Sequence, residues 1–202
     1  EYFETKFLAA CNDAQTANTA NSINGVAHRI VGGNTGRIEL EDFAFMKYSF
    51  DKAKVPQMGR IAIVDPVVEY DLNKLYNASW TVNNPMFDGI ITKGFAQSHK
   101  FVTNIFGFDI WTSNLLPTLD AAEAGLDEAD GTNTGASVGD VANIFMCVAS
   151  DQTKPIMKAW RRKPTVEAWR DHEERKDKVQ ATGRFGLGAQ RLDTLGVVLT
   201  SV

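Results

Sequence analysis

Hydrophobic positions recur along the chain with two different periods. In 1–21 and 39–54 they return every three or four residues, which predicts an amphipathic helix in each segment. Short apolar or alternating runs predict strands at 60–64, 108–112, 141–150 and 196–201. We expect a common sheet core that contains Ile61, Ile63, Val64, Ile144, Phe145 and Val148. This mixture of helical and strand patterns favours an α+β fold.

A strand that leads directly into a helix is the most clearly delimited unit of the sequence. Pro56 and Gly59 predict a turn before the strand 60–64. After the strand, Asp65 is a suitable helix cap, and Pro66 suits the first helical position, where no amide hydrogen is needed. Because no Ser, Cys or His lies at this turn, the unit is interpreted as scaffold and not as a catalytic turn.

Length and charge restrict the class of protein. With 202 residues, of which 44% are hydrophobic, the chain can bury a core as one large or two small domains. A formal net charge of -4 gives no general attraction to nucleic acid or to an anionic membrane. No apolar run approaches the roughly 20 residues that span a bilayer, so we expect no membrane partner. The chain opens with Glu1 inside a helical pattern, and we expect that the full protein continues before it.

Residues with catalytic or metal-binding chemistry are few and scattered. Cys11 and Cys147 lie far apart without a CxxC motif, and we expect both to be small core residues. The histidines have no neighbouring Cys or Ser that would suggest a dyad: His28, His99 and His172. We therefore assign no cofactor, no metal site and no catalytic residue. An α+β hydrolase or transferase with its site in 120–140 remains an alternative.

The segment 118–140 combines glycines with acidic residues, which predicts a surface loop. A calcium-binding loop is the alternative, but the acids around Gly131 do not occupy the alternate positions of an EF-hand.

Four blocks carry a resemblance to a known family. They are VPQMGRIAIVDPVVEYDL, IFGFDIWTSNLLP, VANIFMCVAS and a last segment that runs from KPTVEAWRD to GVVLTS. In this order they resemble the major capsid proteins of tailed bacteriophages, which have the Hong-Kong-97-type fold. The positions that match the family's motifs are Pro56, Gly59, Arg60, Pro66, Gly107, Ser113, Asn114 and Pro117.

The resemblance implies two domains. A peripheral domain of 1–37 and 164–202 would hold the end of a spine helix and a β-sheet. An axial domain of 38–163 would hold a central sheet flanked by helices, with the loop 118–140 at the capsomer centre. The N-terminal arm and extended loop that precede the spine helix in the family are absent from this sequence.

The resemblance also implies a function. The chain would be a coat protein that assembles with itself, as hexameric and pentameric capsomers, into the icosahedral shell around a double-stranded DNA genome. Scaffolding, portal and decoration proteins would be further partners, DNA would be enclosed without sequence-specific binding, and no catalysis would be involved. The protein would be assembled in the host cytoplasm and located in the virion. An encapsulin, which shares the fold but encloses cargo protein, is the alternative.

The run 160–178 holds about a dozen charges of both signs. A solvated surface is one interpretation, and a contact between subunits is the other, because exposed charges of both signs determine which edges meet. The candidate contact residues are Arg161, Arg162, Glu167, Trp169, Arg170, Asp171, Glu173, Glu174 and Arg175. We expect Trp169 to be the apolar anchor of such a contact.

Overall fold

The computed structural model describes residues 2–15, 22–33, 36–76, 104–120, 136–171, 173 and 175–201. The helices are α1 (Tyr2–Ala14), α2 (Leu40–Lys52), α3 (Pro66–Tyr76) and the short 3-10 helix η2 (Leu192–Thr194). The strands are β1 (Ser22–Ile23), β2 (Val26–Ala27), β3 (Arg29–Val31), β4 (Arg60–Val64), β5 (Asn104–Ile105), β6 (Phe108–Thr112), β7 (Val141–Cys147), β8 (Ile156–Asp171), β9 (Lys176–Ala189) and β10 (Leu195–Thr200). The part 121–135 of the predicted loop lies outside the described residues.

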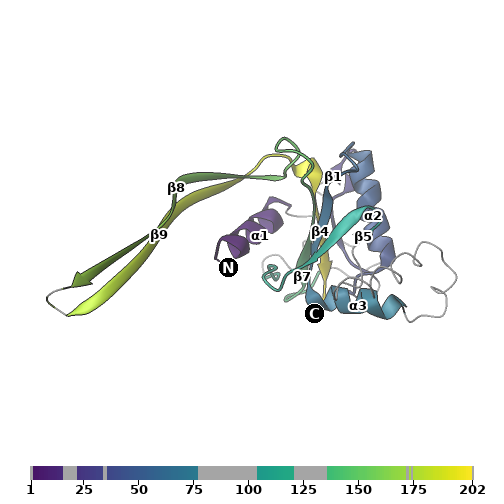
Figure 1. The fold of residues 1–202 in the computed structure, drawn as a ribbon. Coiled ribbons are helices and arrows are strands. Elements are labelled where there is room, and N and C mark those ends of the chain that lie inside the picture. The colour runs from purple at the N-terminus through teal and green to yellow at the C-terminus, as the bar shows by residue number, and fades with distance from the viewer. Residues whose placement is uncertain are drawn as a thin grey trace, which may run out of the picture.

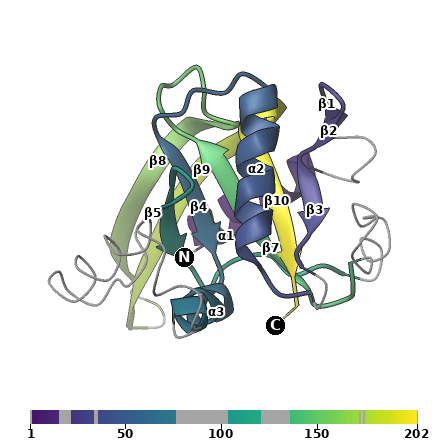
Figure 2. The same ribbon diagram turned by 90° about the vertical axis from the view of Figure 1, so that its right-hand side faces the viewer.

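A mixed six-stranded sheet forms the body of the molecule, in the order β3-β10-β7-β4-β6-β5. The central strand β7 is antiparallel to β10 and β4, while β3 is parallel to β10 and β6 is parallel to β4. Helices α2 and α3 pack on one face of the sheet, and α1 packs on the other (Figure 2). The sheet joins β3 and β10 to β4 and β7, so its hydrogen bonds cross both predicted domain boundaries, and the division into domains stays a prediction.

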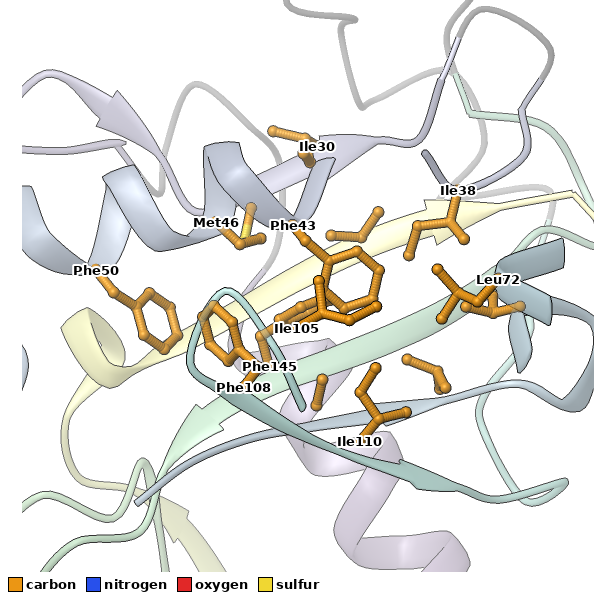
Figure 3. Packing of buried hydrophobic residues seen from close by; sticks show 14 of the residues in the cluster. Ile30, Ile38, Phe43, Met46, Phe50, Leu72, Ile105, Phe108, Ile110 and Phe145 are labelled. Carbon is orange, nitrogen blue, oxygen red and sulfur yellow. The ribbon is translucent and has the colours of Figure 1, made fainter. Parts of the chain in front are cut away.

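Aromatic rings fill the core between α2 and the sheet. Phe145 of β7 lies edge-on to Phe43 of α2 and to Phe108 of β6, with ring centroids 5.2 and 5.1 Å apart (Figure 3). Phe50 of α2 meets Phe108 at 5.5 Å. Edge-to-face pairs at such distances add to the stabilisation from apolar burial.

The residues predicted for the sheet core lie in the sheet or directly after it, but only some of them are fully buried. Val64, Ile144 and Phe145 are fully buried, whereas three predicted core residues are half-buried: Ile61, Ile63 and Val148. These three face the α1 side of the sheet, where they pack against Leu8 and its neighbours.

The strand-to-helix unit is confirmed. β4 occupies the predicted residues, and α3 begins at Pro66. The backbone N–H of Val67 donates to the Asp65 carboxylate at 2.9 Å, which satisfies one of the free amides of the helix N-terminus. Gly59 has φ +71°, and a Cβ on it would lie 2.8 Å from the Cα of Ala149, so both backbone conformation and space require glycine.

The segment 156–189 departs from the sequence prediction. The sequence predicts a charged run at 160–178 and no strand in it, yet β8 and β9 are the longest strands that the structure describes. Because both strands are largely exposed, β8 lacks the continuous apolar face from which strands are recognised. Two smaller differences are that α1 ends at Ala14 although the helix is predicted to reach residue 21, and that β10 begins one residue earlier than predicted.

Candidate subunit-contact site

The charged run lies on a long two-stranded ribbon that projects from the body (Figure 1). β8 and β9 pair antiparallel from Ile156 opposite Ala189 to Asp171 opposite Lys176. The register shifts twice on β8, between Trp160 and Arg162 and again before Thr165. Such bulges bend a ribbon and increase its twist.

Helix α1 holds the base of the ribbon through a cluster of aromatic rings. Phe3 stacks on Trp160 of β8 at 5.6 Å between centroids and meets Phe185 of β9 edge-on at 5.1 Å. The ammonium of Lys158 lies 5.5 Å from the centroid of the Phe3 ring, a cation–π distance. The ribbon is therefore anchored at its base by its packing against α1.

The candidate contact residues are distributed along this ribbon, from just beyond its base at Trp160 to its tip. Those on β8 are Arg161, Arg162, Glu167, Trp169, Arg170 and Asp171, while Glu173 and Arg175 lie in the turn that joins β8 to β9. Glu174 lies outside the described residues. Trp169 is 46% exposed, so a large aromatic side chain stands in solvent on a projecting element. The sequence pattern predicted the charged run as a candidate contact but did not predict the ribbon.

One candidate ion pair is already formed within the subunit. Arg162 donates to the Glu167 carboxylate at 2.9 Å, with both side chains more than half exposed. Exposed pairs of this kind contribute only about 0–1 kcal/mol to stability. The assignment of these residues to contacts with a neighbour stays a prediction.

The remaining motif positions lie at joints of the sheet. Gly107, with φ +90°, forms the tight turn between β5 and β6. The hydroxyl of Ser113, just after β6, donates to the Glu4 carboxylate of α1 at 3.2 Å. The Pro117 carbonyl accepts a hydrogen bond from the Ala142 amide at 3.0 Å, and Asn114 is exposed. These contacts give Gly107, Ser113 and Pro117 a structural role.

The described residues offer little catalytic chemistry. They contain no group of three His, Cys, Asp or Glu side chains placed to hold a metal ion. Cys11 and Cys147 are buried and unpaired with each other, as predicted, and burial raises the pKa of Cys11 to about 12. Within the described part of the chain, no helix has the length and apolar character to cross a membrane. His99 and His172 lie outside it.

An apolar groove of about 690 Å³ lies between α1, the end of β7 and the start of β8. Its apolar lining consists chiefly of Phe3, Phe7, Met146, Val148, Ile156 and Met157. The carboxylate in this lining belongs to Asp151, whose pKa is lowered by a hydrogen bond from Lys154 and by the charge of that ammonium. A carboxyl held ionised in this way is poorly suited to act as a general acid near neutral pH.

His28 is a buried histidine within the sheet body, not at a cleft. Its ring is 0% exposed and stacks on Phe50, and its Nε2 has no hydrogen-bond partner among the described residues. Burial lowers the pKa of His28 below its ordinary value, although a hydrogen bond with the Val26 carbonyl and the charge of Asp193 oppose this shift. Asp193 is itself paired with Arg191.

This arrangement makes stability depend on pH. Between the lowered folded pKa and the ordinary value of about 6.5, unfolded His28 binds a proton and folded His28 does not, so acidification favours unfolding. We expect the free energy of unfolding to fall as the pH is lowered through about 6.5, the ordinary pKa of histidine, and His28→Leu to lose part of that decrease. Denaturant titrations above and below this pH provide the measurement. The same pH dependence in the variant and the wild type would contradict this role of His28.

Comparisons with family models and with solved structures identify proteins that this chain resembles. A family model described as phage capsid protein matches residues 1–200. No curated protein matches the chain. Among solved structures, the capsid of the cyanophage P-SCSP1u is 16% identical with a TM-score of 0.59, over 98% of this chain and 61% of that one. The mature capsid of bacteriophage PhiM1 is 13% identical with a TM-score of 0.61, over 98% of this chain and 60% of that one.

An encapsulin has a similar fold. The SrpI encapsulin complex from Synechococcus elongatus PCC 7942 is 8% identical with a TM-score of 0.55, over 99% of this chain and 62% of that one. The chain thus spans about three fifths of the length of the solved chains it matches. The matches to the two capsids confirm the α+β prediction and the Hong-Kong-97-type fold.

Proposed function

Because the chain belongs to the phage capsid protein family, we propose that it is the shell-forming part of a major capsid protein of a tailed phage. The family match over residues 1–200 is the observation that carries this proposal. The protein assembles with itself, as hexameric and pentameric capsomers, into an icosahedral shell around double-stranded DNA. It acts in the virion after assembly in the host cytoplasm, without a catalytic role, and scaffolding, portal and decoration proteins are its further partners.

The charge of the chain supports this function. A net charge of -4 on 202 residues gives a wall that does not hold the genome through many phosphate contacts. DNA can therefore be packed and released without breaking a large number of salt-sensitive contacts. This is the behaviour that a container for DNA needs, in contrast to a protein that binds DNA by sequence.

The two-domain organisation of the family is part of the proposal. α1 and the outer part of the β8–β9 ribbon belong to the peripheral domain of 1–37 and 164–202, while the first half of β8, which packs on Phe3 through Trp160, lies within the axial range. The sheet with α2 and α3 belongs to the axial domain of 38–163. The pairing of β3 and β10 with the central sheet favours assigning these two strands to the axial domain as well.

The ribbon is the proposed contact between subunits. An isolated subunit gains little from exposed charges, but the same charges repeated around a shell select which edges meet. Shell contacts are heterologous, so one surface of a subunit meets a different surface of the next and the rotation closes into rings. A projecting ribbon with charges of both signs and an exposed Trp169 suits such a contact.

Charge reversal tests this contact. We expect the double variant Arg170→Glu, Arg175→Glu to melt within a few degrees of the wild type, because both side chains are exposed. It should nevertheless fail to form particles in electron micrographs and sedimentation. The matched control reverses two exposed charges at the end of α2, Lys52→Glu and Lys54→Glu, and should assemble normally. Particles at wild-type yield from the ribbon variant, at low and high salt, would show that the ribbon is ordinary surface.

The content of purified particles separates the alternatives. A capsid protein expressed with its phage partners yields particles that contain DNA, whereas an encapsulin yields particles that contain a cargo protein. Absence of any particle from the full-length protein, together with a catalytic activity lost on changes within 120–140, would favour the enzyme.

A further inference from the structure

The outer part of the ribbon has two free edges among the described strands. Beyond the second register shift, 165–171 pairs with 176–182, and no third strand joins this sheet among the residues that the structure describes. Both segments project away from the sheet body (Figure 1). A strand edge presents unpaired N–H and C=O groups that can pair with another chain, and a two-stranded ribbon by itself is marginally stable in water. The outer ribbon is therefore suited to gain further strands.

The register arranges the ribbon's side chains into two different faces. Directly opposite residues of an antiparallel pair point to the same face, and successive residues point to opposite faces. One face carries the pairs Thr165–Thr182, Glu167–Gln180 and Trp169–Lys178. The other face carries the pairs Val166–Ala181, Ala168–Val179 and Arg170–Asp177.

The two strands carry opposite charges on each face, and the signs are exchanged between the faces. On the Trp169 face, β8 presents the carboxylate of Glu167 and β9 presents the ammonium of Lys178. On the opposite face, β8 presents the guanidinium of Arg170 and β9 presents the carboxylate of Asp177. A β8 edge is therefore complementary to a β9 edge on both faces. Two β8 edges or two β9 edges with the same faces aligned would instead bring like charges together.

We propose that the ribbons of neighbouring copies associate edge to edge, with β8 of one copy beside β9 of the next. This proposal rests on the proposed shell function and specifies the contact within it. When adjacent ribbons point the same way, β8 of one runs antiparallel to β9 of the other, so the backbone ladder continues from copy to copy. The register that places Arg170 opposite the neighbour's Asp177 also places Ala168 opposite the neighbour's Val179.

The proposed contact is heterologous, because it joins two different edges of the ribbon. Each copy uses its β8 edge toward one neighbour and its β9 edge toward the other, so the association propagates around a ring. A contact between like edges would instead stop at a pair of subunits. The small side chains of Ala168 and Ala181 beside Val166 and Val179 leave a flat apolar surface across the joined ribbons.

Single-cysteine variants test the arrangement on the full-length protein. Ala168→Cys and Val179→Cys are introduced into separate chains, and the native Cys11 and Cys147 are buried and do not interfere. Facing residues of neighbouring antiparallel strands have Cα atoms about 4.5–5.5 Å apart, within the range that a disulfide spans. After co-assembly and oxidation with copper phenanthroline, we expect covalent dimers in mixed particles. Particles of either variant alone should give none.

The matched control pairs Ala168→Cys with Gln180→Cys, whose side chains point to opposite faces. This mixture should not cross-link. Dimers formed by Ala168→Cys alone or Val179→Cys alone would show a contact between like edges and overturn the proposal, as would mixed particles without dimers. Particle formation is scored first by sedimentation, because a wild-type protein that forms no particles contradicts the shell function itself and removes the basis of the edge contact.

Discussion

Replacing Phe145 by alanine is expected to lower the free energy of unfolding by about 3–5 kcal/mol, the usual cost of emptying an aromatic site in a core. Phe145 is 0% exposed on the central strand β7, and its ring meets Phe43 and Phe108 edge-on. Those neighbours belong to α2 and β6, so the cavity would loosen the contact between helix and sheet. Chemical denaturation of the unassembled subunit measures the effect.

The control for Phe145 is an aromatic residue outside the core. Tyr48 of α2 is 52% exposed, and Tyr48→Ala should change the free energy of unfolding by less than about 1 kcal/mol. Equal losses for the two variants would show that the ring cluster does not hold α2 on the sheet.

Replacing Arg60 by methionine is expected to cost about 2–4 kcal/mol, because buried carbonyl groups lose their hydrogen-bond donor. Arg60 is 2% exposed. Its Nε donates to the Pro56 carbonyl at 3.0 Å, and its Nη2 donates to the Val55 carbonyl at 2.8 Å and to the Asp51 carboxylate at 2.6 Å. Methionine preserves the apolar stem between Phe50 and Phe108 but not these donors.

A second variant separates the two roles of Arg60. If the bonds to the turn carbonyls dominate, Asp51→Asn should cost only about 1 kcal/mol, since Asp51 is 37% exposed and water can solvate it. Arg60→Lys should remain well below the wild type, because one ammonium cannot reproduce the planar guanidinium's set of bonds. A larger loss for Asp51→Asn than for Arg60→Met would indicate that the ion pair is the dominant contribution.

The buried arginine explains part of the motif that carries the family resemblance. The turn at Pro56 and Gly59 brings backbone carbonyls toward β4, and Arg60 at its start satisfies them from inside the core. Sequence reasoning identified these positions but gave Arg60 no role, since a charged residue at a strand end is usually exposed. The ion pair of Arg60 is formed with Asp51 at the end of α2, nine residues earlier in the chain.

The sequence by itself determined those elements whose signals are local. β4 and β6 match their predicted residues, and the Asp65 cap and Pro66 start of α3 follow from neighbouring residues alone. The ordered motifs also led to the capsid family, which the match over residues 1–200 confirms. Local periodicity and capping need no knowledge of distant segments, and for this reason they could be predicted.

The tertiary structure alone decided the form and the faces of the candidate site. A charged segment exposed on both sides has no hydrophobic period, so nothing local distinguishes a ribbon from a solvated loop in 160–178. Its strands exist through pairing with each other, and its base is fixed by Phe3 of α1, more than 150 residues away in sequence. The face to which Trp169 or Arg170 points depends on two bulges in β8, because each inserted residue exchanges the faces of the strand.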